Sequence, residues 1–245
     1  MEIMEQFVQL LRRSQQIVFF GGAGVSTESG IPDFRSADGL YSEKLSQQFT
    51  PEQLVSHTFF ERYPEEFFAF YRQHLLYPAA QPNDAHRALA RLEKLGKLRA
   101  VVTQNIDGLH QRAGSERVLE LHGSVLRNYC EACHAFYGID TILGSEGVPR
   151  CSCGGRIKPD VVLYEEALDQ RVLQAAVREM GQADLLIIGG TSLVVYPAAG
   201  LIRYFGGEHL VLINRSATAA DHEAEMIFRE PIGQVLGEAV KRLCS

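Results

Sequence analysis

The sequence predicts an α/β fold: a doubly wound parallel sheet with a smaller inserted lobe. Short runs of Val, Ile and Leu alternate with segments of helical periodicity. These runs show little alternation of apolar and polar residues, which is typical of strands buried on both faces of a parallel sheet. Two segments, 37–79 and 125–160, interrupt the alternation. Alternating strands and helices favour a Rossmann-like sheet, and we expect the two interruptions to form the lobe.

The chain begins with an amphipathic helix over residues 1–14. This segment lacks the charged start, apolar run and small-residue cleavage site of a signal peptide. No apolar run approaches the ~18 residues of a membrane span. We therefore expect a cytoplasmic protein, in which thiols stay reduced.

Five strands and three further helices are expected along the rest of the chain. The apolar runs that predict strands lie at 16–20, 99–103, 118–121, 184–190 and 209–214. The helical patterns lie at 83–96, 168–181 and 231–244. The first two end at Gly96 and Gly181, and the third has Pro231 in its first turn. Terminal Gly and first-turn Pro are ordinary helix boundaries.

These elements divide the chain into a discontinuous sheet domain and two insertions. We assign residues 1–36, 80–124 and 161–245 to the Rossmann-like domain. Residues 37–79 carry no strand signal and hold an aromatic-rich helical pattern, so they are expected to form a helical insertion. Residues 125–160 contain four clustered cysteines with Gly and Pro between them, and they are expected to form a metal-binding module.

Composition restricts the partners that we expect. The chain has 245 residues, 46% of them hydrophobic, with a net charge of −6. A nucleic-acid-binding protein usually has a basic face or an excess of Lys and Arg, and this chain has neither. We expect neither a nucleic-acid nor a membrane partner. The sequence does not determine the oligomeric state, and a monomer is compatible with it.

The clustered cysteines predict a structural zinc ion, one per chain. Two close pairs are separated by seventeen residues: Cys130 and Cys133, then Cys151 and Cys153. Four thiolates from two such pairs can surround zinc tetrahedrally and leave it no open position for catalysis. His134 is disfavoured as a ligand because it directly follows Cys133. Reduced buried cysteines and a disulfide pair are the alternatives, and Cys244 is expected to pack in the last helix.

A glycine-rich turn follows the first predicted strand. In this turn, the amides of Gly22, Ala23 and Gly24 can approach a pyrophosphate, helped by the dipole of a following helix. Gly-x-Gly alone is weak evidence, and a tight turn without a ligand is the alternative. An acid, an aromatic residue and a base then follow Pro32, namely Asp33, Phe34 and Arg35. A plain dinucleotide loop does not require that triplet.

Polar residues gather where the other predicted strands end, and that edge of a parallel sheet binds ligands. Gly190, Thr191 and Ser192 follow one strand, and Asn214 follows another. The strand that ends at Thr103 leads into Gln104, Asn105, Ile106 and Asp107, although Asn105 or Asp107 could simply cap a helix. His122 ends a strand beside Gly123, and its ordinary pKa near ~6.5 suits general-base catalysis.

Together these motifs closely resemble the sirtuins, NAD-dependent protein lysine deacylases, and most of all the bacterial branch that acts on acetyl-lysine. The matching segments occur in the family's order and cover nearly the whole chain. They are GAGVSTESGIPDFR (22–35), TQNIDGLHQRAG (103–114), HG (122–123), the four cysteines, KPDVVLYEE (158–166) and GTSLVVYPAA (190–199).

The resemblance implies roles for individual residues toward NAD, a co-substrate that is consumed. Ala23 and Thr27 match positions that contact the cofactor, and Arg35 matches one near its phosphates. The adenosine half would lie among Thr191, Ser192, Asn214 and Ile232, close to Gly190. Nicotinamide would lie among Phe34, Ile106 and Asp107, with Asp33 either touching that pocket or serving only the loop. Gln104 and Asn105 match positions around the nicotinamide ribose, and His122 matches the general base, with Asn105 as the other residue assigned to catalysis.

The resemblance also implies the reaction and its substrates, acetylated proteins. The acyl-lysine carbonyl oxygen would attack the ribose carbon as nicotinamide leaves, and His122 would help to deprotonate a ribose hydroxyl that attacks the resulting imidate carbon. The products would be free lysine, nicotinamide and O-acetyl-ADP-ribose. Phe34, Val162 and Tyr164 match the lining of the acyl-lysine tunnel, and the peptide would add as a strand beside them.

Two departures from the family concern the substrate. Glu165 stands where relatives commonly have glycine, and a carboxylate there could favour basic peptides. The desuccinylating branch places a Tyr and an Arg three residues apart, where this chain has Phe68 and Tyr71. We therefore expect uncharged acyl groups, although the sequence does not determine the acyl length or the target proteins.

Three other functions stay open at this point. An NAD-dependent oxidoreductase with a structural zinc would share the strand and glycine turn, but the expected ribose-binding acid after the second strand is not evident. An ADP-ribosyltransferase could use the same scaffold. A zinc-based binding module would need no catalysis at all.

Overall fold

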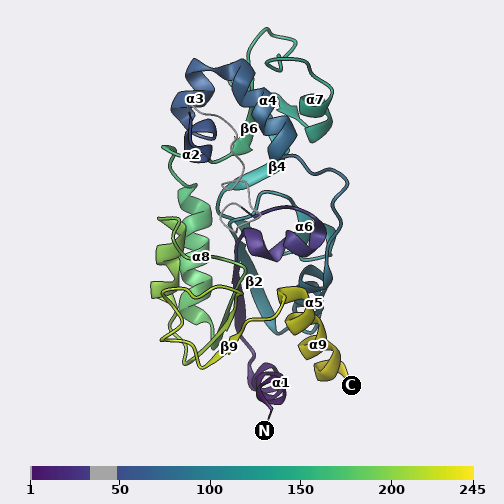
Figure 1. Cartoon of the computed structure of the whole chain (residues 1–245), viewed down its shortest axis with the longest axis vertical. Helices are drawn as coiled ribbons and strands as arrows, with labels where there is room; N and C mark the ends of the chain where they lie inside the picture. Colours follow the sequence, from purple (N-terminus) through teal and green to yellow (C-terminus); the bar gives the residue numbers. More distant parts are fainter. Residues whose placement is uncertain (1, 34–48) are drawn as a thin grey trace.

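The protein has two lobes, a large one built on a parallel sheet and a small one above it (Figure 1). The computed structural model describes residues 2–33 and 49–245. The large sheet has six strands, and every pair in it is parallel. In spatial order they are β3 (Val118–Glu120), β2 (Leu98–Thr103), β1 (Ile17–Gly21), β7 (Leu185–Gly189), β8 (His209–Ile213) and β9 (Met226–Phe228).

The strand order determines where a ligand can bind. From β1 the chain moves outward to β2 and β3 on one side, and β7, β8 and β9 build the other side. The order therefore reverses between β1 and β7, whose carboxyl ends are at Gly21 and Gly189. In an open α/β sheet, ligands bind in the crevice at such a reversal. All residues of β1 and β7 are buried, which explains their unbroken apolar runs.

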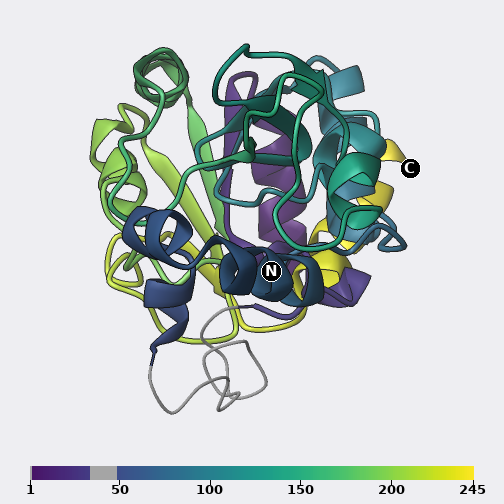
Figure 2. The ribbon, with the colours of Figure 1, turned by 90° about the horizontal axis from the view of Figure 1, so that it is seen from above.

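Helices cover both faces of this sheet, as the views from the side and from above show (Figures 1 and 2). On one face, α1 (Ile3–Arg13), α5 (Asp84–Lys94) and α9 (Ile232–Cys244) pack against Phe19 of β1. On the other face, α8 (Gln170–Gln182) and the 3₁₀ helix η4 (Ala198–Tyr204) pack against Phe20. Successive strand residues point to opposite faces, so β1 contributes to both cores.

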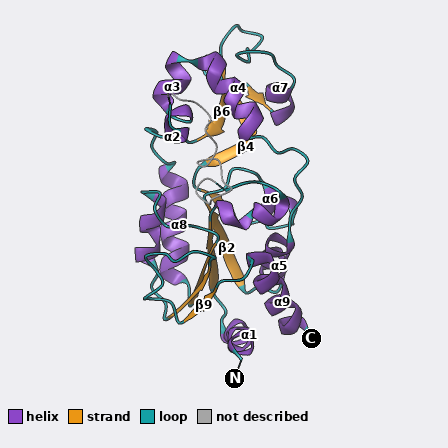
Figure 3. Cartoon of the chain, viewed as in Figure 1, coloured by secondary structure: helices purple, strands orange, loops and turns teal. Residues whose placement is uncertain are grey.

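The small lobe combines a second sheet with short helices (Figure 3). Its sheet is antiparallel, in the order β5 (Phe136–Tyr137), β4 (Gly123–Cys130) and β6 (Ile157–Val161). The helices are α2 (Pro51–Leu54), α3 (His57–Arg62), α4 (Pro64–His74) and α7 (Ile139–Leu143). The aromatic residues of α3 and α4, with Phe60, Phe67 and Tyr71 fully buried, form a core with Ile157 of β6.

The predicted fold class is confirmed, with differences in single elements. Strand β9 and the small sheet were not predicted. Helix α8 runs through Gly181 to Gln182 instead of ending at the glycine. The turn after β1 continues as two 3₁₀ helices, η1 (Ala23–Val25) and η2 (Thr27–Ser29), and not as an α-helix. Gly30 in the left-handed conformation ends η2, and so no long helix dipole points at the turn.

The domain boundaries given above stay a prediction. Short connecting elements complete the large lobe, among them α6 (Leu109–Arg112) between β2 and β3. In the part of the chain that the structure describes, every helix is too short or too polar to cross a bilayer.

Candidate active site

A cavity of about 1130 Å³ opens at the carboxyl ends of the parallel strands, beneath the small lobe. It brings together every predicted cofactor-binding and tunnel residue within the described ranges. These are Gly22, Ala23, Gly24, Thr27, Asp33, Gln104, Asn105, Ile106, Asp107, His122, Val162, Tyr164, Gly190, Thr191, Ser192, Asn214 and Ile232. Phe34 and Arg35 lie outside the described residues.

The glycine turn packs against the loop that follows β7. The Gly24 amide donates to the Gly190 carbonyl oxygen at 2.8 Å, and the Gly22 amide donates to Gly189 at 3.3 Å. A Cβ on Gly24 would lie 2.8 Å from the Gly190 Cα. Close backbone packing therefore requires glycine here. The two hydrogen bonds also occupy the amides of Gly22 and Gly24, two of the three amides that we expected to approach a pyrophosphate.

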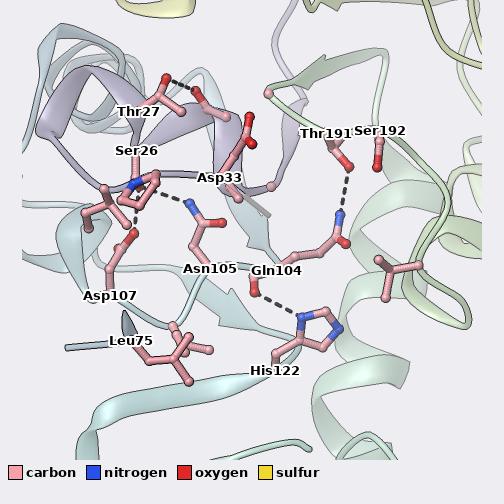
Figure 4. A pocket seen from close by; sticks show the side chains of 18 of the residues that line it. Ser26, Thr27, Asp33, Leu75, Gln104, Asn105, Asp107, His122, Thr191 and Ser192 are labelled. Atoms are coloured by element: carbon pink, nitrogen blue, oxygen red, sulfur yellow. Dashed lines mark hydrogen bonds between the residues drawn. The ribbon is translucent and has the colours of Figure 1, made fainter. Parts of the chain in front are cut away.

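A buried polar network links this turn to the end of β2 (Figure 4). The Ser26 hydroxyl donates to Asp107 Oδ2 at 2.6 Å, and Asn105 Nδ2 donates to Ser26 Oγ at 3.1 Å. Burial raises the pKa of Asp107, while the Ser26 hydroxyl and the Leu109 amide act in the opposite direction. Sequence reasoning missed Ser26. Its position just after the glycine turn was the available signal.

The N-cap of α6 is Gly108 and not Asp107, but the Asp107 carboxyl does bond the first turn of that helix. Its Oδ1 accepts from the Leu109 amide, at the start of α6, at 2.9 Å. The same carboxyl therefore serves the backbone through one oxygen and the Ser26–Asn105 network through the other.

His122 lies between the two lobes with its ring on the cavity. Its Nδ1 is 3.0 Å from the Gln104 carbonyl oxygen. A carbonyl oxygen only accepts, so Nδ1 carries the hydrogen and Nε2 keeps the lone pair that a general base needs. Burial lowers the pKa of His122, which favours the neutral, basic form at neutral pH.

The far end of the cavity is polar and lies at the ends of three strands. Gln104 Nε2 donates to Thr191 Oγ1 at 3.1 Å, which joins the ends of β2 and β7. Asn214 at the end of β8 donates to the Ser216 carbonyl oxygen at 2.8 Å. Ile232 is buried at the first turn of α9, where the Gly233 amide donates to Glu28 at 2.7 Å.

The segment after β6 forms the other wall of the cavity. Tyr164 makes a short parallel bridge with Ser56, and the Glu165 carboxylate accepts from the Thr58 amide at 2.9 Å and its hydroxyl at 2.7 Å. Those two hydrogen bonds lower the pKa of Glu165, so it is ionised. The carboxylate is thus bound to α3 through Oε2, and Glu165 remains exposed on the cavity, so its effect on peptide preference stays a prediction.

The residues compared with the desuccinylating branch do not reach the cavity. Phe68 and Tyr71 are fully buried in the small-lobe core. The neighbouring Arg72 donates to the Ile142 carbonyl oxygen and to Ser145, each at 2.9 Å. Arg72 is engaged elsewhere, and the Tyr71 hydroxyl, although it has no hydrogen-bond partner, is buried and does not line the cavity, so neither is available to an acyl carboxylate.

The four predicted metal ligands come together away from this cavity. Their sulfur atoms all lie within 4.8 Å of one another, and three of the sulfur pairs are 3.5 Å apart. A zinc ion about 2.3 Å from four sulfurs needs them roughly 3.8 Å apart. The Cys153 amide, followed by the Tyr137 hydroxyl, lowers the pKa of Cys151, while at Cys153 the effect of the Gly155 amide is outweighed by hydrogen bonds among the neighbouring sulfurs, which raise the pKa of that thiol. The cluster therefore fits a structural zinc ion.

The turn around the second cysteine pair depends on its glycines. Gly154 adopts a φ of 86°, and a Cβ on Gly155 would lie 2.7 Å from the Cys130 sulfur. His134 is not in the cluster, in agreement with the sequence. The expectation for Cys244 is wrong: it is exposed at the last residue of α9, because the helix face that packs inward ends before it.

Fold and site together define a Rossmann-like protein with a dinucleotide-sized crevice and a tetrathiolate metal module. A profile of the Sir2 family matches residues 22–197. This chain belongs to the Sir2 family, the sirtuins.

Relatives and solved structures of this family match the chain over nearly its whole length. An "NAD-dependent protein deacetylase" of Clostridium perfringens is 66% identical over 95% of this chain and 96% of its own length. One of Staphylococcus aureus strain Mu50 is 42% identical over 95% of this chain and 96% of its own length. A Sir2 structure with a p53 peptide and NAD⁺ has a TM-score of 0.85 and 40% identity, and it covers 98% of both chains.

Proposed function

We propose that this protein is an NAD-dependent protein lysine deacetylase. It consumes acetyl-lysine, NAD and one water molecule, transfers the acetyl group to the ADP-ribose part of NAD, and releases nicotinamide, O-acetyl-ADP-ribose and free lysine. The single observation that carries the proposal is His122, which presents a basic Nε2 to a crevice at the reversal of a parallel sheet. A related Sir2 structure holds a deacetylated p53 peptide with 3′-O-acetyl-ADP-ribose, the products of this reaction.

Different residues of the cavity have different roles in this reaction. Ser26, Asn105 and Asp107 form a hydrogen-bonded set beside the site assigned to nicotinamide. Thr191 and Asn214 lie at the polar end assigned to adenosine. Nε2 of His122 accepts the proton of the ribose hydroxyl as that oxygen attacks the acyl carbon. No side chain of the protein acts as the nucleophile.

Substrate choice follows from the same observations. The acyl-lysine enters beside Val162 and Tyr164, and uncharged acyl groups are preferred because Arg72 is engaged elsewhere. Acetylated proteins are therefore the partners, and the cytoplasm is the proposed location.

The test is incubation of the protein with NAD and an acetyl-lysine peptide. We expect free nicotinamide and O-acetyl-ADP-ribose in equal amounts, and at least ~100-fold less of each with His122→Ala, since general-base catalysis contributes about 10²–10⁴-fold. Because burial lowers the pKa of His122, wild-type kcat/KM should fall only below about pH 6.5, as the ring becomes protonated. A reduced cofactor, or ADP-ribose attached to protein, would contradict the proposal.

A further inference from the structure

The junction between the two lobes is bridged by one arginine. Arg127 of β4 places Nη1 2.7 Å from Oε2 of Glu120, the last residue of β3. Its Nε lies 2.7 Å from Oδ2 of Asp160 in β6. The guanidinium thus joins a strand of the large sheet to a strand of the small one. The side chain of Glu120 is only 9% exposed, and it also accepts from Gln111 Nε2 at 2.9 Å.

His122 lies inside the ring of links that this arginine closes. The Val162 amide donates to the His122 carbonyl oxygen at 3.0 Å. The ring runs from Glu120 through Arg127 to Asp160, along the chain to Val162, across to His122, and back to Glu120. The backbones of β4 and β6 are closely packed within this ring, because a Cβ on the adjacent Gly123 would lie 1.9 Å from the Asp160 carbonyl oxygen.

We propose that Arg127 is a positioning residue for deacetylation: it closes this ring and so holds His122 in register with the Val162 segment that receives the acyl-lysine. The inference rests on the proposed function. The imidazole has one hydrogen bond to the rest of the described chain, at Nδ1. The placement of Nε2 therefore depends largely on the backbone that the ring holds.

An arginine suits this position because of its shape. Its planar fork presents donors to two carboxylates at once, whereas a lysine ammonium is a single point charge. Without the guanidinium, the nearly buried Glu120 would lose its cation and Asp160 would lose its link to β3. The backbone pairing of β4 with β6 would remain, but β3 would lose its side-chain link to both strands, and the segment between β3 and β4 that carries His122 would be held less tightly.

The test compares Arg127→Met and Arg127→Lys with Arg171→Met. Arg171 also pairs with a carboxylate, Asp169, but it is 92% exposed and does not line the cavity. We expect kcat for nicotinamide release to fall about tenfold in Arg127→Met, because small misplacements of catalytic groups are costly. The KM for NAD should change little, Arg127→Lys should recover part of the loss, and Arg171→Met should match the wild type.

A second readout separates positioning from general destabilisation. Water entering the loosened junction should move the acid limb of the pH profile, and the NMR titration of His122, to higher pH in Arg127→Met. An unchanged kcat, or a lower thermal stability with an unchanged titration, overturns the proposal. If Arg127→Met does not fold, Glu120→Gln tests the same ring. Absence of nicotinamide release by the wild type would refute the proposed function instead, and the titration would still test the ring.

Discussion

Asp107 illustrates how opposing effects act on one carboxyl group in this site. Burial raises its pKa, and hydrogen bonds from Ser26 and Leu109 lower it. The two oxygens accept from different elements, Oδ2 from the glycine turn and Oδ1 from the start of α6. The carboxyl is thereby held in one orientation, and it presents a fixed edge to the cavity before any ligand binds.

Glu165 is a second residue whose role depends on its surroundings. It has a φ of 77°, a left-handed conformation that costs a residue with a side chain about 1–2 kcal/mol. Its two hydrogen bonds with Thr58 offset part of this strain and tie the cavity wall to α3. The carboxylate thus ties the cavity wall to α3 through Oε2, while Glu165 itself lines the cavity.

We predict that Glu165→Gly weakens peptide binding without affecting the chemistry. Glycine removes both the backbone strain and the link to α3, so the segment that carries Val162 and Tyr164 becomes looser. The KM for an acetyl-lysine peptide should rise several-fold, while kcat and the KM for NAD stay near the wild-type values. Steady-state assays with each substrate varied in turn measure this.

Two further variants make that prediction specific. Thr58→Val removes the hydroxyl donor and should reproduce part of the rise in KM. Glu208→Gly replaces an exposed glutamate that does not line the cavity and should have no effect. An unchanged peptide KM in Glu165→Gly would show that the link to Thr58 has no part in the groove.

At the scale of elements, the start of α5 supports the cofactor turn. Asn83 caps this helix, with its Oδ1 accepting from the Ala85 amide at 3.0 Å. Its Nδ2 donates to the Val25 carbonyl oxygen at 2.7 Å and to Ser29 Oγ at 3.0 Å. One buried side chain therefore caps the start of a helix and holds η1 and η2, which carry the predicted cofactor contacts.

Substitutions of Asn83 should separate these two roles. Asn83→Ala removes both, and we expect the free energy of unfolding to fall by about 1–2 kcal/mol and the KM for NAD to rise. Asn83→Asp keeps the capping oxygen but loses the Nδ2 donors, so stability should fall less while the KM for NAD still rises. Chemical denaturation and initial rates measure the two effects, and a normal KM for NAD in Asn83→Asp would contradict the second role.

The individual helices and strands show how much of the fold can be predicted from the sequence. The strands buried on both faces and the periodic helices were predicted to within a few residues, because each pattern is local. Strands β4 and β6 were not, since β4 has an irregular register between Ser124 and Asn128 and β6 contains Pro159. Strand β9 is a three-residue edge strand. Contacts such as Glu165 with Thr58 join residues over a hundred positions apart, and no local pattern predicts them.

At the scale of the whole molecule, the two lobes have separate cores and contribute to one cavity. The large-lobe cores lie on the two faces of the parallel sheet, and the small-lobe core lies around α3, α4 and β6. The residues assigned to adenosine come from the large lobe, while Val162 and Tyr164 follow a small-lobe strand. Damage to the small lobe should therefore weaken the binding of the peptide more than the binding of NAD.

The cysteine cluster offers a way to test this division. Metal analysis should find one zinc ion per chain, and a chelator should remove it with a drop in thermal stability, because structural zinc sites contribute directly to folding free energy. Cys130 and Cys151 lie in the small-lobe core, so its packing should loosen with the metal. Peptide binding should then be lost while the large lobe still binds ADP-ribose.

Single substitutions give the matched comparison for this last prediction. Cys151→Ser removes a ligand and should reproduce the effect of the chelator, whereas Cys244→Ser, at an exposed position on the last helix, should behave as the wild type. Calorimetry with an acetyl-lysine peptide and with ADP-ribose reports the two lobes separately. Equal loss of both ligands would mean that the lobes fold as one cooperative unit, and equal stability of the two variants would mean that the cluster holds no structural metal.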